Sequence, residues 1–340
     1  QTKLKLMNSE QKIAFERDVY EDFPTLAVGG RVIMLLKNAD MGIITREAAE
    51  AEIARLSKIN TDWYDVLFRS PFSQNHNVSL SGGNRTNHYY ASLGMRNSHG
   101  VIPVNDYNNY NAMLRTQHQF TKKLSISFDL SANFRKNMDS SAGANLLSYA
   151  TFANPYERPY DENGNVEYDR SYSYGLSTLK DGYKSDFNIL EELHNNTTTT
   201  TSLSARASLG LKWQILKNLQ YSTTMAFNCN YSNTEATLQP GSDTSRNRSW
   251  IAAIYNELPD DLNLGQLTER DTRSESYTWQ NQLNYTLSLK DSHFLSVFFG
   301  HEISEYKSYS NYTLYPEYDP DMGIFNIPAF GVQQVETIQR

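Results

Sequence analysis

The sequence predicts an all-β fold, a partial transmembrane antiparallel β-barrel of about eight to ten strands. Three observations lead to this prediction. Long stretches alternate apolar and polar residues with a period of two, which is typical of strands with two different faces. Most of these stretches reach the roughly 9–11 residues that a strand needs to cross a bilayer. The links between them alternate between short turns and long loops, as in barrels whose turns and loops lie on opposite sides of a membrane.

The composition is compatible with such a barrel and argues against several other classes. The 340 residues have a formal net charge of −7, and the basic residues are scattered, so no nucleic-acid partner is expected. Mean hydropathy is −0.61, and no stretch reaches the roughly 18 apolar residues of a transmembrane helix. The single cysteine, Cys229, rules out an internal disulfide. Abundant Tyr, with 23 residues against 4 Trp, suits both membrane interfaces and sugar binding.

Residues 1–73 are predicted to form a segment of helices and loops between barrel strands. A short helix begins near Asn8 or Ser9 and ends before Pro24, because the residue before a proline avoids the helical conformation. A second helix is expected over residues 45–56. Thr45 is its N-cap, and acidic residues in its first turn favour the positive end of the helix dipole.

Residues 74–340 are predicted to be antiparallel barrel strands joined by turns and loops. The clearest alternation covers residues 124–135, where Leu, Ile, Phe and Ala alternate with Ser, Asp, Asn and Arg. Further strands are expected at 88–96, 110–120, 203–213, 219–231, 277–289 and 294–303. Short turns are expected at 82–84, 121–123, 216–218 and 290–292, and long loops at 137–198 and 234–273. A soluble sandwich would show the same alternation, but its strands usually have only about 5–6 residues.

Two groups of residues are candidates for substrate binding. One is a set of tyrosines in the first long loop, because aromatic faces stack on sugar rings; packing of the loop or a partner interface would also explain them. The other is a set of charged residues on the polar faces of strands, which would touch solute or water in a wide pore and would pair in a narrow one. The candidates are Tyr156, Tyr160, Tyr168, Tyr172, Tyr174, Arg96, Arg115, Asp129, Arg135 and Arg206.

The sequence contains no recognisable catalytic or metal-binding motif. Residues 161–165 resemble the start of a calcium loop, but Val166 stands where an EF-hand needs glycine, and Asn163-Gly164 predicts a turn. The motifs of serine hydrolases, zinc proteases and phosphate-binding loops are missing. We therefore expect no enzyme activity, no metal and no cofactor. The alternative function is a soluble or surface-attached β-rich carbohydrate-binding module without transport; a glycan hydrolase, supported only by numerous carboxylates, comes last.

The segment over residues 60–115 resembles the SusC/RagA-type TonB-dependent outer-membrane transporters. The residues that carry the resemblance are 61–65, 68–69, 74–83, 89–94, 100–102 and 107–111. The helix at 45–56 and residues 158–164 also look like this family, and the resemblance weakens after about residue 190. One departure is Asn108-Asn109, where the family pattern has a more basic pair.

The resemblance implies a barrel of about 22 strands in the outer membrane of a Gram-negative bacterium. Its implied function is TonB-dependent active import of an oligosaccharide or, in some members, a peptide. The implied partners are a SusD-like surface lipoprotein, the TonB-ExbB-ExbD complex, outer-membrane lipid and the cargo. The plug domain and the TonB-contacting segment are not recognised in this sequence. The chain is therefore expected to be an arc of the barrel with two open edges.

Overall fold

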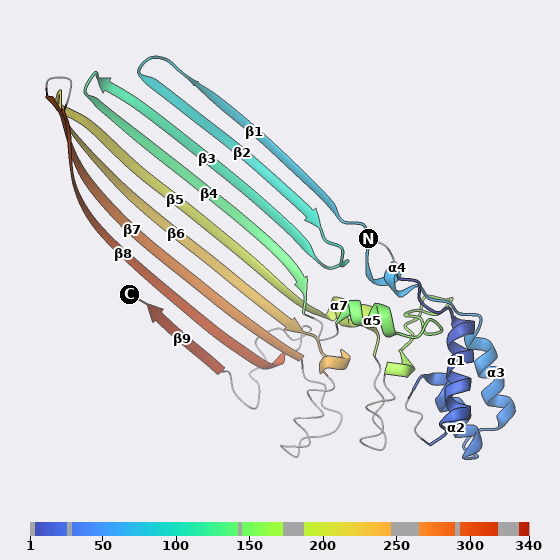
Figure 1. Ribbon diagram of the computed structural model, residues 1–340. Helices are drawn as coiled ribbons and strands as arrows, with labels where there is room; N and C mark the ends of the chain where they lie inside the picture. The colour runs from blue at the N-terminus through green and yellow to red at the C-terminus, as the bar shows by residue number, and fades with distance from the viewer. Residues whose placement is uncertain are drawn as a thin grey trace.

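The computed structural model describes residues 4–25, 29–141, 145–172, 187–245, 265–289, 293–318 and 333–339. Within these residues, nine strands form one antiparallel sheet in which the spatial order follows the chain. The sheet is open, with β1 and β9 at its edges, and the helices gather at one end of it (Figure 1). The predicted all-β fold and strand number are therefore confirmed. Among the described residues, no helix combines the length and apolar character needed to span a membrane.

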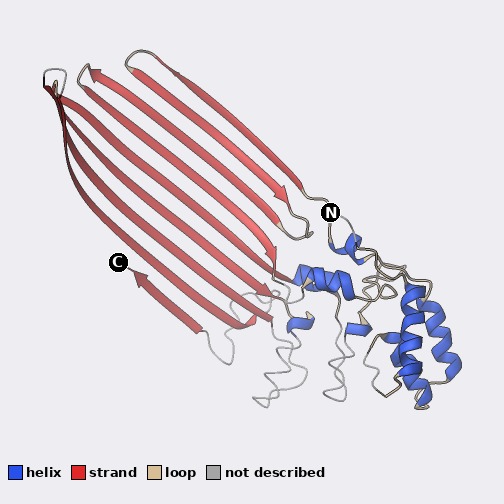
Figure 2. Ribbon diagram, viewed as in Figure 1, coloured by secondary structure: helices blue, strands red, loops and turns tan. Residues whose placement is uncertain are grey.

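The strands become longer along the chain, from 12 residues in β1 to 26 in β8. Figure 2 shows the short connections at the end of the sheet that lies away from the helices. This is the sorting of links that the sequence predicted. The strands are β1 (Phe72–Gly83), β2 (Asn87–His99), β3 (Asp106–Thr121), β4 (Leu124–Ser140), β5 (Asn196–Leu216), β6 (Leu219–Leu238), β7 (Gly265–Leu289), β8 (His293–Tyr318) and β9 (Gln333–Gln339).

Several strands extend into the segments predicted as long loops. The predicted loop at 234–273 is too long at both ends, because β6 continues to Leu238 and β7 begins at Gly265. The predicted loop at 137–198 is closer, since β4 ends at Ser140 and β5 begins at Asn196. The strands extend beyond the prediction because both faces of the sheet carry polar side chains at these strand ends. The alternation that marks a strand disappears, whereas the backbone ladder between β6 and β7 continues.

The register gives the sheet one apolar and one polar face. Leu114, Leu130 and Ala207 lie opposite one another in a row across β3, β4 and β5, and the neighbouring row holds Arg115, Asp129 and Ser208. Since successive side chains on a strand point to opposite faces, this separation extends from β2 to β7, whereas β8 also carries Phe294 and Phe298 on the polar face. Many of the large apolar side chains are exposed. They include Leu93, Leu114, Leu130, Leu209, Met225, Trp279 and Ile303.

In residues 1–73, two predicted helices are confirmed and two others were missed; α5 (Leu146–Phe152) and α7 (Ile189–Asn195), within the predicted loop at 137–198, were also not predicted. α1 (Ser9–Asp22) begins with a capping box on Asn8, and α3 (Arg46–Leu56) begins with Thr45 as N-cap. The missed helices of residues 1–73 are α2 (Arg31–Asp40) and α4 (Trp63–Leu67). α2 follows Gly30 without a side-chain cap, so the usual N-terminal signal is absent. The five residues of α4 are too few to show helical periodicity.

The helices pack around two small cores, which together we call the helical lobe (residues 8–25, 29–69, 145–172 and 187–195). The first core lies among α1, α2 and α3. The second joins α4 to α5 (Leu146–Phe152) and α7 (Ile189–Asn195). The buried residues of the first core are Ile13, Val32, Leu36, Ile53, Leu56 and Tyr156; those of the second are Trp63, Leu67, Tyr149, Ala150, Phe187, Ile189 and Leu193.

Candidate functional site

The five charged candidates all lie on the polar face of the sheet. Arg96 is on β2, Arg115 on β3, Asp129 and Arg135 on β4, and Arg206 on β5. Arg115 and Asp129 are directly opposite, with Nε 3.0 Å from Oδ1. Their side chains remain 62% and 45% exposed, so this ion pair contributes less than about 1 kcal/mol.

The other three arginines have no carboxylate partner within the described part of the chain. Arg96 and Arg135 flank Asn109 in a single cross-strand row. The guanidinium of Arg96 lies over the ring of Tyr107, 5.9 Å from its centre. Arg135 borders a hollow of about 450 Å³ at the end of the sheet near the helical lobe. Arg206 lies closer to the turn end, opposite Ser131.

Tyr156 is not available to a cargo, which corrects its assignment as a substrate-binding residue. Its side chain is fully buried in the first core of the helical lobe. Its hydroxyl donates a hydrogen bond to Oε1 of Glu16 at 2.7 Å and accepts one from the backbone N–H of Arg31 at 3.1 Å. The apolar pocket among α1, α2 and α3 accommodates the apolar ring. Polar groups at the rim of this pocket form hydrogen bonds with the hydroxyl.

The remaining tyrosines have different surroundings. Tyr160 and Tyr172 are exposed, by 42% and 44%, and Tyr168 is half-buried. The ring of Tyr172 stacks on Phe187 with centroids 3.8 Å apart. Tyr174 lies outside the described residues. The structure does not bring these tyrosines together with the arginines of the polar face.

The segment that resembled a calcium loop forms the predicted turn. The carboxylate of Asp161 accepts hydrogen bonds from the backbone N–H groups of Asn163 and Asn165, both at 2.8 Å. Gly164 has φ of +82°, a left-handed conformation that favours glycine. The carboxylate of Asp161 and these two backbone N–H groups are thus hydrogen-bonded within the turn.

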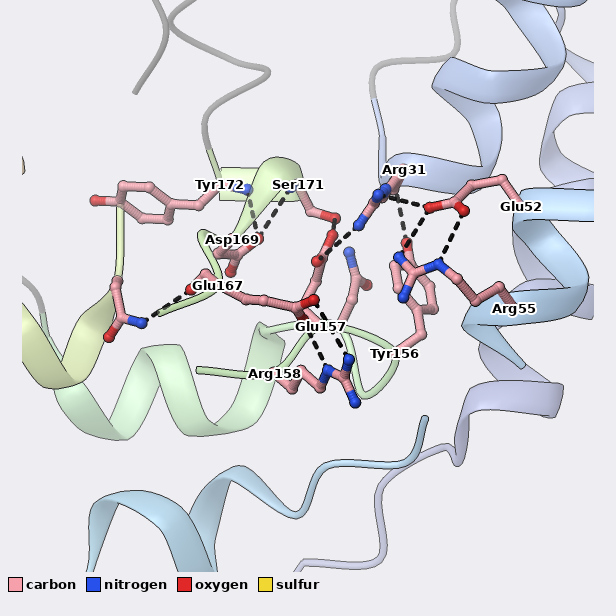
Figure 3. A network of polar contacts seen from close by, with 12 residues as sticks. Arg31, Glu52, Arg55, Tyr156, Glu157, Arg158, Glu167, Asp169, Ser171 and Tyr172 are labelled. Atoms are coloured by element: carbon pink, nitrogen blue, oxygen red, sulfur yellow. Dashed lines mark hydrogen bonds and ion pairs between the residues drawn. The ribbon is translucent and has the colours of Figure 1, made fainter. Parts of the chain in front are cut away.

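A network of polar and charged side chains joins α2 and α3 to the loop that follows α5 (Figure 3). Arg31 contacts two carboxylates, with its guanidinium 2.6 Å from Glu52 and 3.5 Å from Glu157. Ser171 donates a hydrogen bond to the other oxygen of Glu157 at 2.8 Å. Arg55 in turn donates to Glu52 at 2.9 Å. These contacts fix the loop against the two helices.

Two buried carboxylates in this network hold protons more tightly than usual. Asp169 accepts hydrogen bonds from the Tyr149 hydroxyl at 2.6 Å and from the backbone N–H groups of Ser171 and Tyr172 at 2.9 Å. Burial nevertheless raises the pKa of Asp169 above its ordinary value. Burial, followed by the nearby charge of Asp169, raises the pKa of Glu157 to about 7. The network therefore changes its protonation close to neutral pH.

These carboxylates were missed in the sequence because they carry no local signal. Arg31 and Glu157 are 126 residues apart, and neither belongs to a motif. The Arg115–Asp129 pair did have a signal. A turn centred on residue 122 places these two residues opposite each other, since they lie at equal distances from it along the hairpin.

The comparisons with known proteins find relatives among transporters. The sequence is 25% identical over 181 residues to the TonB-dependent receptor SusC of Bacteroides thetaiotaomicron, which covers 49% of this chain and 18% of that protein. The fold matches a structure of the RagAB peptide transporter with a TM-score of 0.70 at 16% identity, covering 98% of this chain and 36% of that one. The RagAB peptide importer in the 'open-open' state matches with a TM-score of 0.70 at 17% identity and the same coverage.

No family model matches the sequence. The chain spans about a third of the length of the solved chains that it resembles. Its open sheet corresponds to part of the barrel of TonB-dependent receptors.

Proposed function

We propose that this chain, which is part of the barrel of a SusC/RagA-type TonB-dependent transporter, forms one wall of a passage that imports an oligosaccharide or peptide nutrient across the outer membrane. One observation carries the proposal. The apolar and polar residues of β2 to β7 are largely separated onto two faces in continuous register. An apolar face this large is unfavourable in water and suits contact with lipid.

The extent of the apolar face supports a membrane location. Towards the helical lobe, its apolar residues largely give way to polar ones, and on four strands an aromatic residue lies at this boundary. These residues are Tyr110 on β3, Phe134 on β4, Tyr231 on β6 and Tyr277 on β7. Aromatic residues gather at the membrane–water interface of outer-membrane barrels. β7 and β8 continue beyond this boundary with charged side chains on the same face, including Glu275 and Lys307.

The polar face supports a passage for a hydrophilic cargo. It carries mainly hydroxyl and amide side chains, such as Asn111, Asn133 and Ser204 in one row. These groups donate and accept hydrogen bonds and suit sugars or peptide backbones. In this proposal the helical lobe lies on the outer side of the membrane, where a SusD-like surface lipoprotein would cover the barrel. The TonB-ExbB-ExbD complex supplies the energy through other regions of the transporter.

Uptake by cells tests this proposal. The full-length transporter is expressed with its neighbouring lipoprotein in a host that lacks it, and uptake of fluorescent oligosaccharides and peptides is measured. We expect saturable uptake of at least one cargo that stops when the TonB-contacting segment is deleted or an uncoupler is added. Equal uptake with and without the transporter contradicts the proposal. Full solubility without detergent would instead favour a carbohydrate-binding module without transport.

A further inference from the structure

The two faces of the sheet differ in charge as well as in polarity. The chain has a net charge of −7, yet the polar face of β1 to β8 carries six basic and only three acidic residues among the described side chains. The basic residues are Arg96, Arg115, Arg135, Arg206, Lys212 and Arg270; the acidic residues are Asp129, Asp139 and Glu302. A positive surface on an acidic protein raises the local concentration of anions.

Contacts within the sheet engage several of these charges, but only one of the six basic residues has a carboxylate partner among the described residues, and Arg96 lies over the ring of Tyr107. Arg115 pairs with Asp129, and Arg270 lies over the ring of Tyr312. Arg96 and Arg135 lie two strands apart in one row, so their Cα atoms are about 10 Å apart. Both side chains are exposed and form no ion pair within the described residues. Long flexible side chains at this separation can reach the same anionic group.

The nearby carboxylates do not neutralise this pair. Asp106 is held by Arg69 at 3.2 Å and by His99 at 2.6 Å. Asp139 lies four residues beyond Arg135 on β4, about 13 Å along the strand, and accepts a hydrogen bond from Asn137.

We infer that Arg96 and Arg135 bind the carboxylates of an acidic oligosaccharide, a uronic-acid polymer in chemical class. This inference rests on the proposed function and specifies its cargo. Guanidinium groups bind carboxylates through paired, charge-assisted hydrogen bonds. Arg135 borders a hollow of about 450 Å³ that Tyr107, Asn137 and Thr200 help to line, together with Asp106 and Asp139.

The groups around the arginines favour a sugar over a peptide. Ser98, Tyr107 and Thr200 offer hydroxyl groups in the adjacent row. Between the arginines, the side-chain oxygen of Asn109 is buried without a hydrogen-bond partner in the described structure. Rotation of this amide towards a sugar hydroxyl would satisfy it. Peptide recognition in this row would need apolar pockets for side chains, and the hollow is lined mainly by polar residues.

Binding to the purified full-length transporter in detergent tests the inference. The probes are a galacturonic acid hexamer, a neutral galactose hexamer and a glutamate hexapeptide, each at two salt concentrations. We expect the wild type to bind the galacturonic acid hexamer at least about tenfold more tightly than either other probe. The double variant Arg96→Gln/Arg135→Gln loses this preference and keeps its affinity for the neutral hexamer. Arg273→Gln, which removes one positive charge from the opposite face, leaves the preference unchanged.

The single variant Arg135→Lys adds a readout that does not depend on loss of charge. It keeps the positive charge but loses the planar fork, so its preference should fall between the wild type and the double variant. Three results overturn the inference: no preference for the acidic hexamer in the wild type, loss of both hexamers in the double variant, or equal binding of the glutamate hexapeptide. If the wild type imports only neutral sugars or peptides, the inference fails while the proposed function stands.

Discussion

The hydroxyl of Tyr156 donates a hydrogen bond to the carboxylate of Glu16 across 140 positions of sequence, at 2.7 Å. Both side chains are buried. This contact joins α1 to the loop after α5 and holds the ring of Tyr156 in the first core of the helical lobe. The helical lobe thus depends on a contact between a helix and a loop that lie far apart in the sequence.

Replacing Tyr156 with phenylalanine should destabilise the helical lobe while keeping its shape. Tyr156→Phe removes a hydroxyl that serves Glu16 and the backbone of Arg31. The buried partners left unsatisfied cost about 1–3 kcal/mol. Hydrogen exchange of α1 and α2 in the full-length protein measures this change. Tyr160→Phe, at an exposed residue, is the control and should change stability by less than about 0.5 kcal/mol.

The stability of the helical lobe should fall as the pH rises from about 5 to 8. The pKa of Glu157 is about 7 in the folded protein, against an ordinary value of 4.5. The folded state binds this proton more tightly, so its contribution is complete below pH 4.5 and is lost as the pH passes 7. The contribution is at most about 3 kcal/mol. Proteolysis at the loop after α5, followed against pH, measures it.

Glu157→Gln serves as the matched control for this pH dependence. The glutamine keeps the shape of the protonated acid and does not titrate. Proteolysis of this variant should change much less between pH 5 and pH 8 than that of the wild type. If the variant showed the same pH dependence as the wild type, another group would be responsible. Asp169 is one such group, because burial also raises its pKa.

The Arg115–Asp129 pair should contribute little to stability. Both side chains are largely exposed on the polar face, and exposed pairs yield about 0–1 kcal/mol. A double-mutant cycle with Arg115→Gln and Asp129→Asn, read from urea unfolding in liposomes, gives the coupling energy. A coupling above about 2 kcal/mol would mean that the pair is shielded from water in the complete barrel.

A charge on the apolar face should be far more costly than a charge on the polar face. Leu130 and Ser131 are neighbours on β4 and lie on opposite faces. Leu130→Arg would place a cation in lipid at a cost of about 2–4 kcal/mol near the middle of the bilayer. Ser131→Arg should cost close to zero because its face is wet. Urea titration of the folded fraction in liposomes compares the two, and equal costs would contradict the assignment of faces.

The strands could be predicted from the sequence because one face of the sheet is apolar and the other is polar. Where this difference ends, as at Thr234 on β6 and Asp271 on β7, which lie on opposite faces of the sheet, the prediction ends too, although the backbone ladder continues. The same alternation placed all five charged candidates on the correct face. Alternation alone did not distinguish the paired Arg115 from Arg135, because pairing also depends on the strand register, which the turn near residue 122 sets.

The helical lobe was harder to predict because its contacts connect distant parts of the chain. Tyr156 lies in a predicted long loop, where substrate binding, packing of the loop or a partner interface would each explain a tyrosine. Its burial depends on a pocket formed by helices that precede it by more than 100 residues. The Arg31–Glu157 contact depends on the same packing, so neither residue could be recognised from its neighbours in sequence.

The most direct test of the account is the water accessibility of two adjacent residues. Leu130→Cys and Ser131→Cys are made separately in the full-length protein after its native cysteines are replaced, and each protein is treated in the membrane with a water-soluble, membrane-impermeant maleimide. We expect rapid labelling at position 131 and none at position 130. Equal labelling of both, or labelling of position 130 alone, would contradict a sheet with one face in lipid and the other along an aqueous passage.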